Sequence, residues 1–175
     1  MSAEYGLVRG SGWVALLDRR LTREKLAYTV VNASISGDTT SGGVSRLPAL
    51  LAQYKPAVVV LQLGGNDALR GLPLAMTQSN LTTMARASKA AGARVLIAGI
   101  QVPPNYGRKY TDDFAALFGA VARTEGAALT PFLLEGVANA PNADALFQTD
   151  RIHPKAEAHA RMLENLWPAL RSLLR

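Results

Sequence analysis

The chain alternates short, almost continuously apolar runs with longer segments in which apolar residues recur every three to four positions. The clearest apolar runs are residues 57–63 and 94–100, and residues 28–31 and 127–129 are shorter examples. Strands that are covered by helices on both faces have this composition. The pattern therefore predicts strands of a mostly parallel sheet with helices between them, which is the α/β class.

Five segments carry the helical periodicity: residues 13–21, 44–54, 74–91, 112–125 and 154–174. The last segment keeps its apolar residues on one stripe, as an amphipathic helix docked on a core does; they are Ala158, Met162, Leu166, Leu170 and Leu173.

Four loops contain unusual polar chemistry: residues 32–43, 64–73, 102–110 and 136–154. Three of them directly follow a predicted strand, and the fourth leads into the last helix. In an open parallel sheet, functional groups gather beyond the carboxyl ends of the strands. These loops are therefore the first place to look for a site.

Length and composition then limit the possible kinds of protein. A chain of 175 residues that is 49% hydrophobic and 18% charged predicts one domain, residues 1–175, with a substantial core. The absence of cysteine excludes a disulfide framework, a Cys-based zinc site and a thiol nucleophile. Two histidines without an H-E-x-x-H motif are too few for a dedicated zinc site, and no phosphate-binding loop is present, so we expect no cofactor.

The formal charge of +6 raises nucleic-acid binding as a third possible function. However, the 19 basic residues are scattered and are not interleaved with aromatic residues, which make up 6% of the chain, so we expect no nucleic-acid partner. No apolar run approaches the roughly 20 residues of a membrane span, and residues 1–20 do not resemble a signal peptide. As given, the chain is expected to be cytoplasmic, or periplasmic or secreted if an upstream segment carried a signal.

One loop carries a histidine and a carboxylate at an informative spacing. His153 precedes a proline at a predicted helix start, and Asp150 lies three residues before it. In a tight turn this spacing lets the carboxylate accept a hydrogen bond from one ring nitrogen while the other faces outward, which is the arrangement of a general base and its orienting acid. The alternative is an ordinary surface or core histidine, which describes His159 better.

Two further loops offer hydrogen-bond donors. The Ser36-Gly37-Asp38 turn is either only a turn or a site where the Gly37 N–H donates to a developing oxyanion. Asn66, which follows two glycines, is either a turn former or a side-chain amide aimed at the same oxyanion. Neither motif is specific by itself.

The three blocks NASISGDT, LGGND and DRIHP, in this order on an α/β chain, resemble the SGNH (GDSL-type) hydrolases. The stretches VVNASISGDTTSGG, RLPALL, LQLGGNDALRG and VPPNYGRKY are similar to the bacterial branch of that family, whose members act as thioesterase, arylesterase, lysophospholipase and protease. The resemblance covers essentially the whole chain. It implies a three-layer α/β/α, flavodoxin-like fold and a small acyl ester or thioester as substrate.

The resemblance also implies roles for single residues. Gly37 and Asn66 would donate to the oxyanion, His153 would be the general base and Asp150 its orienting acid. Asp67 would shape its loop rather than react. The segment 102–110 would border an acyl-binding cleft, with Tyr106 and the Pro103-Pro104 pair as wall residues.

The chain departs from the family at its start. The family's first strand ends in Gly-Asp-Ser-Leu-Ser, where the first serine is the nucleophile, whereas this chain begins at the equivalent of the Leu-Ser pair. The nucleophile and the first strand are therefore expected upstream of Met1. Two substitutes are disfavoured: Ser2, because it is expected on a flexible terminus, and Thr39, because its surroundings match the second block.

A missing interior strand would leave two unpaired strand edges, residues 28–31 on one side and 57–63 on the other. We expect the chain to respond by homo-oligomerisation, by strand exchange or by pairing the two edges directly. The leading hypothesis is thus an esterase or thioesterase whose activity is impaired in the chain as given. The alternative is a non-catalytic acyl-binding or oligomerising remnant of the same fold.

Overall fold

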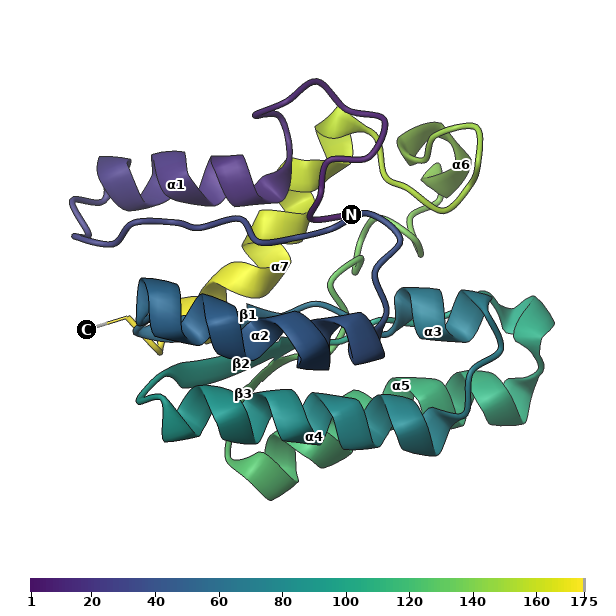
Figure 1. Cartoon of the computed structure of the whole chain (residues 1–175). Helices are drawn as coiled ribbons and strands as arrows, with labels where there is room; N and C mark the ends of the chain where they lie inside the picture. The colour runs from purple at the N-terminus through teal and green to yellow at the C-terminus, as the bar shows by residue number, and fades with distance from the viewer. Residues whose placement is uncertain (175) are drawn as a thin grey trace. The chain divides into compact units, whose positions relative to one another are not determined.

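A computed structural model describes residues 1–174 of the chain, and at Pro104 it describes the backbone alone (Figure 1). None of the helices in this described part combines the length and the apolar composition that crossing a membrane requires.

The chain forms two compact units, each built from two separate stretches of sequence. The first unit comprises Met1–Ser36 and Leu134–Trp167, and the second comprises Gly37–Leu133 together with the described residues from Pro168 onward. The expectation of a single domain over residues 1–175 stays a prediction.

A parallel sheet of three strands organises the second unit. The strands lie in the order β1-β2-β3, and they are β1 (Val58–Leu61), β2 (Arg94–Ala98) and β3 (Ala128–Thr130). The register pairs Val59 with Val95 and Ile97 with Leu129. The predicted α/β class with a parallel sheet is therefore confirmed. β1 and β2 are three and two residues shorter than their apolar runs, and β3 has the length of its run but is shifted by one residue.

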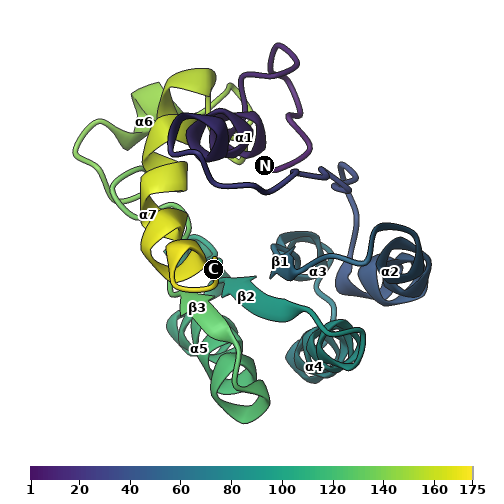
Figure 2. The same ribbon diagram turned by 90° about the vertical axis from the view of Figure 1, so that its left-hand side faces the viewer.

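Two long helices, α4 (Leu74–Ala90) and α5 (Arg108–Glu125), cover one face of this sheet, and α2 (Thr40–Tyr54) packs against α4 (Figure 2). Alternate residues of β2 point into this layer, where they meet the apolar stripes of the helices. The resulting core is almost free of solvent; its largest members include Leu81, Met84, Ile97, Phe114 and Phe118. This core holds the strand ends, and thus the loops beyond them, at fixed positions.

The first unit contains α1 (Trp13–Arg23), the short α6 (Ala143–Leu146) and, after a 3-10 turn at Ala156–Ala158, most of α7 (His159–Arg171). Helices α1 and α7 are in contact, since the Trp13 N–H at the start of α1 donates to Nδ1 of the buried His159 at the start of α7 at 2.9 Å (Figure 1). Further along, Arg20 pairs with Glu164 at 2.6 Å and lies over the Trp167 ring at 4.0 Å.

The predicted strand at residues 28–31 is wrong. The segment forms no ladder with another strand of the described residues, its side chains are half-buried or exposed, and the Tyr28 N–H donates locally to the Leu26 carbonyl. Its aromatic and β-branched composition favours a strand only where a neighbouring strand supplies a pleated surface to pack on. Composition alone therefore misassigned it.

Helix boundaries and two loops also differ from the prediction. Helix α2 begins four residues before the predicted start at residue 44, because the Thr39 hydroxyl accepts from the Gly42 N–H as an N-cap. The glycine pair at 42–43 has low helix propensity, so the sequence did not predict this first turn. The last helix begins at His159 rather than at 154, because Pro154 forms an isolated bridge with Phe147 instead. The loops at 64–73 and 136–154 contain the short helices α3 (Gly65–Leu69) and α6.

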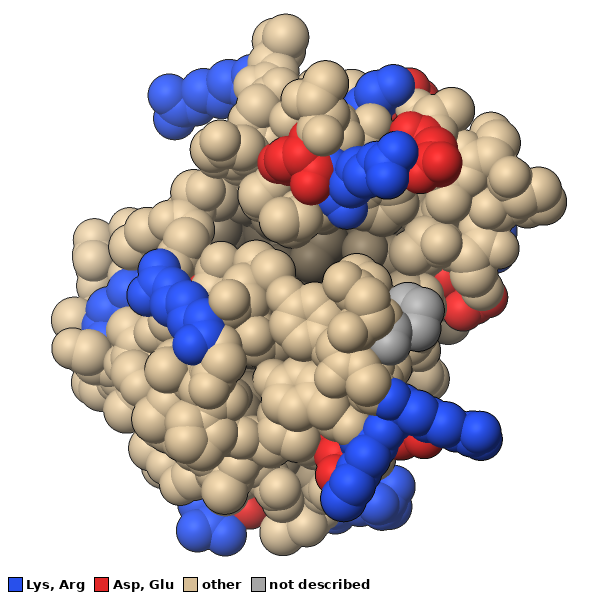
Figure 3. Space-filling model, turned by 90° about the vertical axis from the view of Figure 1, so that its right-hand side faces the viewer, with Lys and Arg blue, Asp and Glu red and all other residues tan. Residues whose placement is uncertain are grey.

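Many basic side chains lie beside acidic ones. The pairs include Arg20 with Glu24, Arg46 with Asp38, Arg86 with Glu125 and Lys109 with Asp113. On the face in Figure 3, Lys and Arg side chains stand apart on largely uncharged surface. The expectation that nucleic acid is not a partner stays a prediction.

Candidate active site

Asp150 and His153 meet in one tight turn of the first unit. One carboxylate oxygen, Oδ2, lies 2.7 Å from His153 Nδ1, and Oδ1 accepts from the backbone N–H groups of Ile152 and His153 at 2.9 and 3.0 Å. Arg151 between them takes the left-handed conformation, with φ of 55°. The structure thus brings together the two residues that the sequence proposes as acid and base.

These contacts fix the charge of Asp150 and the tautomer of the neutral His153 ring. Partial burial would raise the pKa of Asp150, but hydrogen bonds from the His153 N–H, the His153 ring and the Ile152 N–H outweigh burial and lower this pKa to about 2. Asp150 is therefore a carboxylate at neutral pH and can only accept. His153 must carry its proton on Nδ1, so the neutral ring has its lone pair on Nε2, where a general base needs it.

Gly37, the first candidate oxyanion donor, lies in the second unit just before α2. Its φ of 78° is in the left-handed region, which glycine reaches without strain, and the space where a Cβ would stand is empty. Within the described residues, no group accepts a hydrogen bond from the Gly37 N–H. An exposed, unengaged N–H beside open space is what an oxyanion donor requires.

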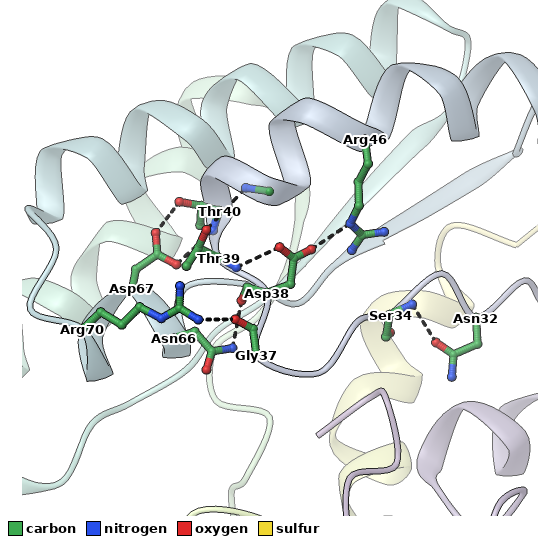
Figure 4. Close-up of polar contacts among 11 residues, drawn as sticks. Asn32, Ser34, Gly37, Asp38, Thr39, Thr40, Arg46, Asn66, Asp67 and Arg70 are labelled. Carbon is green, nitrogen blue, oxygen red and sulfur yellow. Dashed lines mark hydrogen bonds and ion pairs between the residues drawn. The ribbon is translucent and has the colours of Figure 1, made fainter.

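Asn66, the second candidate donor, lies in the first turn of α3, where Gly64 with φ of 118° turns the chain out of β1. Its Nδ2 donates to the Asp38 carbonyl at 2.8 Å (Figure 4). Only one of the two amide hydrogens is needed for this bond, which leaves the other for a ligand. The structure therefore places Asn66 against the Gly37 loop, as a shared role requires.

Two arginines that the sequence did not reveal hold the Gly37 loop. Arg70 donates to the Gly37 carbonyl at 2.8 Å, and Arg46 pairs with the Asp38 carboxylate at 2.7 Å (Figure 4). Because Asn66 also donates to the Asp38 carbonyl, the carbonyl groups of two successive residues, Gly37 and Asp38, each accept a side-chain hydrogen bond. The conformation of the backbone around Gly37 is thus fixed by side chains from α2 and from the end of α3.

Asp67 is fully buried, and its carboxylate joins three elements. It accepts from the Thr40 N–H at 2.9 Å and from the Thr40 hydroxyl (Figure 4). It also accepts from the Thr77 hydroxyl at 3.3 Å. These contacts tie α3 to the first turns of α2 and α4. Asp67 thereby has the loop-shaping contacts that its place beside Asn66 suggests, and no free oxygen faces solvent.

Tyr106 lies in a 3-10 turn at Pro104–Tyr106, and the side chain of Pro104 lies outside the described part of the structure. The Tyr106 ring stacks on Tyr110 with centroids 6.0 Å apart, and both line a surface hollow together with Gly107, Arg108, Lys109 and Asp113. The Tyr110 hydroxyl is buried, and burial raises its pKa. An aromatic wall is therefore present in the segment where an acyl-binding cleft is predicted.

The two substitute nucleophiles are engaged elsewhere. Ser2 is 6% exposed and its hydroxyl accepts from the Trp13 indole N–H at 3.0 Å, so the expected flexible terminus is wrong. This hydrogen bond from Trp13 holds Ser2 against the start of α1. The Thr39 hydroxyl serves as the N-cap of α2.

Comparison with known proteins identifies the family of the chain. The chain matches the family model of the GDSL-like lipases/acylhydrolases over residues 1–161. Esterase TesA of Pseudomonas aeruginosa PAO1 is 55% identical over 174 residues, which cover 99% of this chain and 85% of that protein. Thioesterase 1/protease 1/lysophospholipase L1 of Escherichia coli K12 is 40% identical over 158 residues, covering 90% of this chain and 73% of that protein.

Comparison of the fold with solved structures leads to the same family as comparison of the sequence. A crystal structure of the psychrotrophic esterase EstA from Pseudoalteromonas sp., inhibited by monoethylphosphonate, is similar with a TM-score of 0.90 at 37% identity, covering 98% of this chain and 92% of that one. The predicted SGNH-type α/β fold is thereby confirmed. By motif order, sequence and fold, the chain belongs to the GDSL-like lipase/acylhydrolase family.

Proposed function

We propose that this chain carries the general base, the orienting acid and the oxyanion donors of a serine-type hydrolase of acyl esters or thioesters. The observation that carries the proposal is the Asp150–His153 pair, in which an ionised carboxylate accepts from Nδ1, so that the lone pair of the neutral ring is on Nε2. Relatives named esterase and thioesterase support the substrate class.

In the proposed reaction a serine hydroxyl attacks the acyl carbonyl while His153 Nε2 takes its proton. The negative charge on the carbonyl oxygen accepts hydrogen bonds from the Gly37 N–H and the Asn66 amide. The tetrahedral species then expels the alcohol or thiol, which receives the proton from His153. Water repeats the sequence on the acyl-enzyme and releases the carboxylic acid. Removing one oxyanion donor, as in Asn66→Ala, is expected to lower kcat by about 10²–10³.

The attacking serine is the open element of the proposal. The buried Ser2 hydroxyl and the capping Thr39 hydroxyl are both engaged, so neither is expected to attack. A fluorophosphonate probe, which modifies only an activated hydroxyl, locates the nucleophile directly when the labelled peptide is mapped by mass spectrometry.

The labelling is compared across matched variants. His153→Ala and Asp150→Ala should abolish or slow labelling and turnover of a p-nitrophenyl ester, while Asp144→Ala, which removes an exposed carboxylate on α6, should leave both unchanged. One labelled residue that depends on His153 supports the hydrolase. No label and no turnover, with saturable binding of a fatty acid, supports the alternative acyl-binding role.

We also propose that the chain forms homo-oligomers through β1. Val58–Leu61 is entirely apolar, stands at the edge of the strand order, and pairs within the described residues only with β2. Such an edge is a template for another strand. Light scattering at micromolar concentration tests this: a dimer that Val59→Lys dissociates supports the proposal, and a monomeric parent protein contradicts it.

A further inference from the structure

An aromatic ring from the N-terminal loop lies against the imidazole of His153. The centroids of the Tyr5 and His153 rings are 4.6 Å apart and the ring planes are inclined by 38°. Among the described residues, Asp150 is the only hydrogen-bond partner of the imidazole, at Nδ1. One hydrogen bond fixes one edge of a ring but leaves rotation about that bond possible. The Tyr5 ring restricts that rotation.

Gln148 connects Tyr5 to the histidine turn. Its backbone N–H donates to the His153 carbonyl at 2.8 Å. Its side-chain amide donates to the Tyr5 carbonyl at 2.9 Å and to the Pro154 carbonyl at 3.2 Å. One residue thus holds the backbone of Tyr5 and the backbone on both sides of the His153–Pro154 peptide bond.

The N-terminal loop is shaped for this contact at Gly6. Gly6 has φ of 71°, and a Cβ there would collide with Oε1 of Gln148. Glycine reaches this φ without strain and leaves room for the Gln148 side-chain amide beside the loop. By contrast, the Tyr5 side chain is 53% exposed, so its ring is not there to fill a core.

We propose that Tyr5 and Gln148 are positioning residues that hold the His153 imidazole in the orientation required of a general base. This inference rests on the proposed function of His153. Gln148 fixes the backbone of the turn and of the Tyr5 loop, and the Tyr5 ring fixes the imidazole plane while Asp150 fixes its Nδ1 edge. A base needs its nitrogen held within roughly 0.5 Å and 10–20° of the productive geometry, which one hydrogen bond does not ensure.

The test uses NMR of the histidine rings, because the chain has only two histidines and the buried His159 is an internal reference. Tyr5→Leu should remove the ring-current shift of the His153 ring protons. The His153 ring should also change from one fixed orientation to an average over several, which broadens or shifts its ring signals. Tyr5→Phe should restore the parent spectrum, since the phenyl ring suffices.

Matched controls separate positioning from general stability. Tyr54→Leu removes another exposed tyrosine, from α2, and Gln78→Ala removes an exposed amide from α4; both should leave the His153 signals unchanged. Gln148→Ala should change the chemical shifts of the His153 ring. Unchanged His153 signals in Tyr5→Leu overturn the proposal, and because Tyr5 is exposed this variant should fold even if Gln148→Ala does not.

The kinetic consequence is a fall in kcat with little change in KM, because a misplaced base affects the chemical step and not substrate binding. We expect a loss of about ten- to a hundredfold for Tyr5→Leu and near-parent activity for Tyr5→Phe. The NMR result does not need turnover. The NMR comparison therefore decides whether Tyr5 and Gln148 position His153 even where esterase activity is impaired, whereas the labelling and turnover experiments decide the proposed function.

Discussion

At the scale of single residues, Arg151 shows how the acid–histidine turn is built. Its left-handed φ of 55° lets the N–H groups of Ile152 and His153 both reach the same Asp150 oxygen. A side chain with a Cβ reaches this conformation at a cost of roughly 1–2 kcal/mol. The hydrogen bonds to Asp150 offset that cost.

Substitutions at Arg151 should follow backbone preference and not charge. Arg151→Gly should leave the free energy of unfolding near that of the parent, because relief of strain is offset by a more flexible unfolded chain. Arg151→Val should destabilise by about 1–2 kcal/mol, because a β-branched residue is poorly suited to positive φ. Urea unfolding measures both. Arg9→Val, at an exposed loop position without positive φ, is the control, and an equal loss there would refute the backbone argument.

The sequence predicted the residues that share a short motif and missed those that meet through the fold. Asp150 and His153 were predictable because their spacing permits one tight turn. Tyr5 and Gln148 were not, because their contact spans 143 positions and neither residue type signals chemistry. Arg70 was missed for the same reason, since only the structure shows its guanidinium at the Gly37 carbonyl.

At the scale of elements, Asp67 connects three helices. It belongs to α3, and its fully buried carboxylate accepts hydrogen bonds from residues of both α2 and α4. Asp67→Asn would turn an amide NH₂ toward groups that only donate to the carboxylate. We expect a loss of about 2–4 kcal/mol in the free energy of unfolding, measured in urea. Asp18→Asn on exposed α1 surface should cost almost nothing. A similarly small loss in Asp67→Asn would show that the hydrogen bonds of Asp67 contribute little to stability.

The contact between α1 and α7 should make the protein sensitive to acid. Burial lowers the pKa of His159 and the amino terminus lowers it further, while a hydrogen bond with the Pro154 backbone and the charge of Glu4 partly oppose both. The unfolded chain, with a histidine pKa near 6.5, therefore takes up its proton first as the pH falls. Stability should be full above that value and decline below it.

Thermal unfolding between about pH 7 and pH 5 checks this expectation. His159→Asn keeps an acceptor for the Trp13 N–H but does not titrate, so its Tm should be lower than that of the parent at neutral pH and should change less on acidification. Parallel Tm curves for parent and variant would exclude His159 as the source of the acid sensitivity.

Strands and helices were predictable to different degrees. The runs at 57–63 and 94–100 were assigned correctly because length, apolar composition and burial all agree there. Residues 28–31 have the same local preference but no ladder partner among the described residues, so local preference misled. The first turn of α2 was hidden because a cap, and not helix propensity, begins it.

At the scale of the whole molecule, the two compact units share the chain in an interleaved way. The first takes its residues from both sides of the second, and α7 passes from one unit into the other without a break. Neither unit is a continuous stretch that could be cut out. We therefore expect one cooperative unfolding transition.

Two probes test the cooperativity. Both tryptophans of the chain, Trp13 and Trp167, belong to the first unit, so fluorescence reports on that unit alone, whereas far-UV circular dichroism reports on the helices of both. Coincident urea midpoints are expected for a two-state molecule. Midpoints that differ beyond error would show that the units unfold independently and would contradict the single domain predicted from length.

The tie between α1 and α7 also sets the order of events on the ribosome. The Trp13 N–H and its acceptor on His159 are 146 residues apart in the chain. At roughly 5–20 residues per second, synthesis of that interval takes on the order of 10 s. The sheet with α4 and α5 is synthesised before then, while the Trp13 N–H still lacks its acceptor on α7. The nascent protein therefore passes several seconds without the contact between α1 and α7, which makes α1 the segment that a holding chaperone would bind.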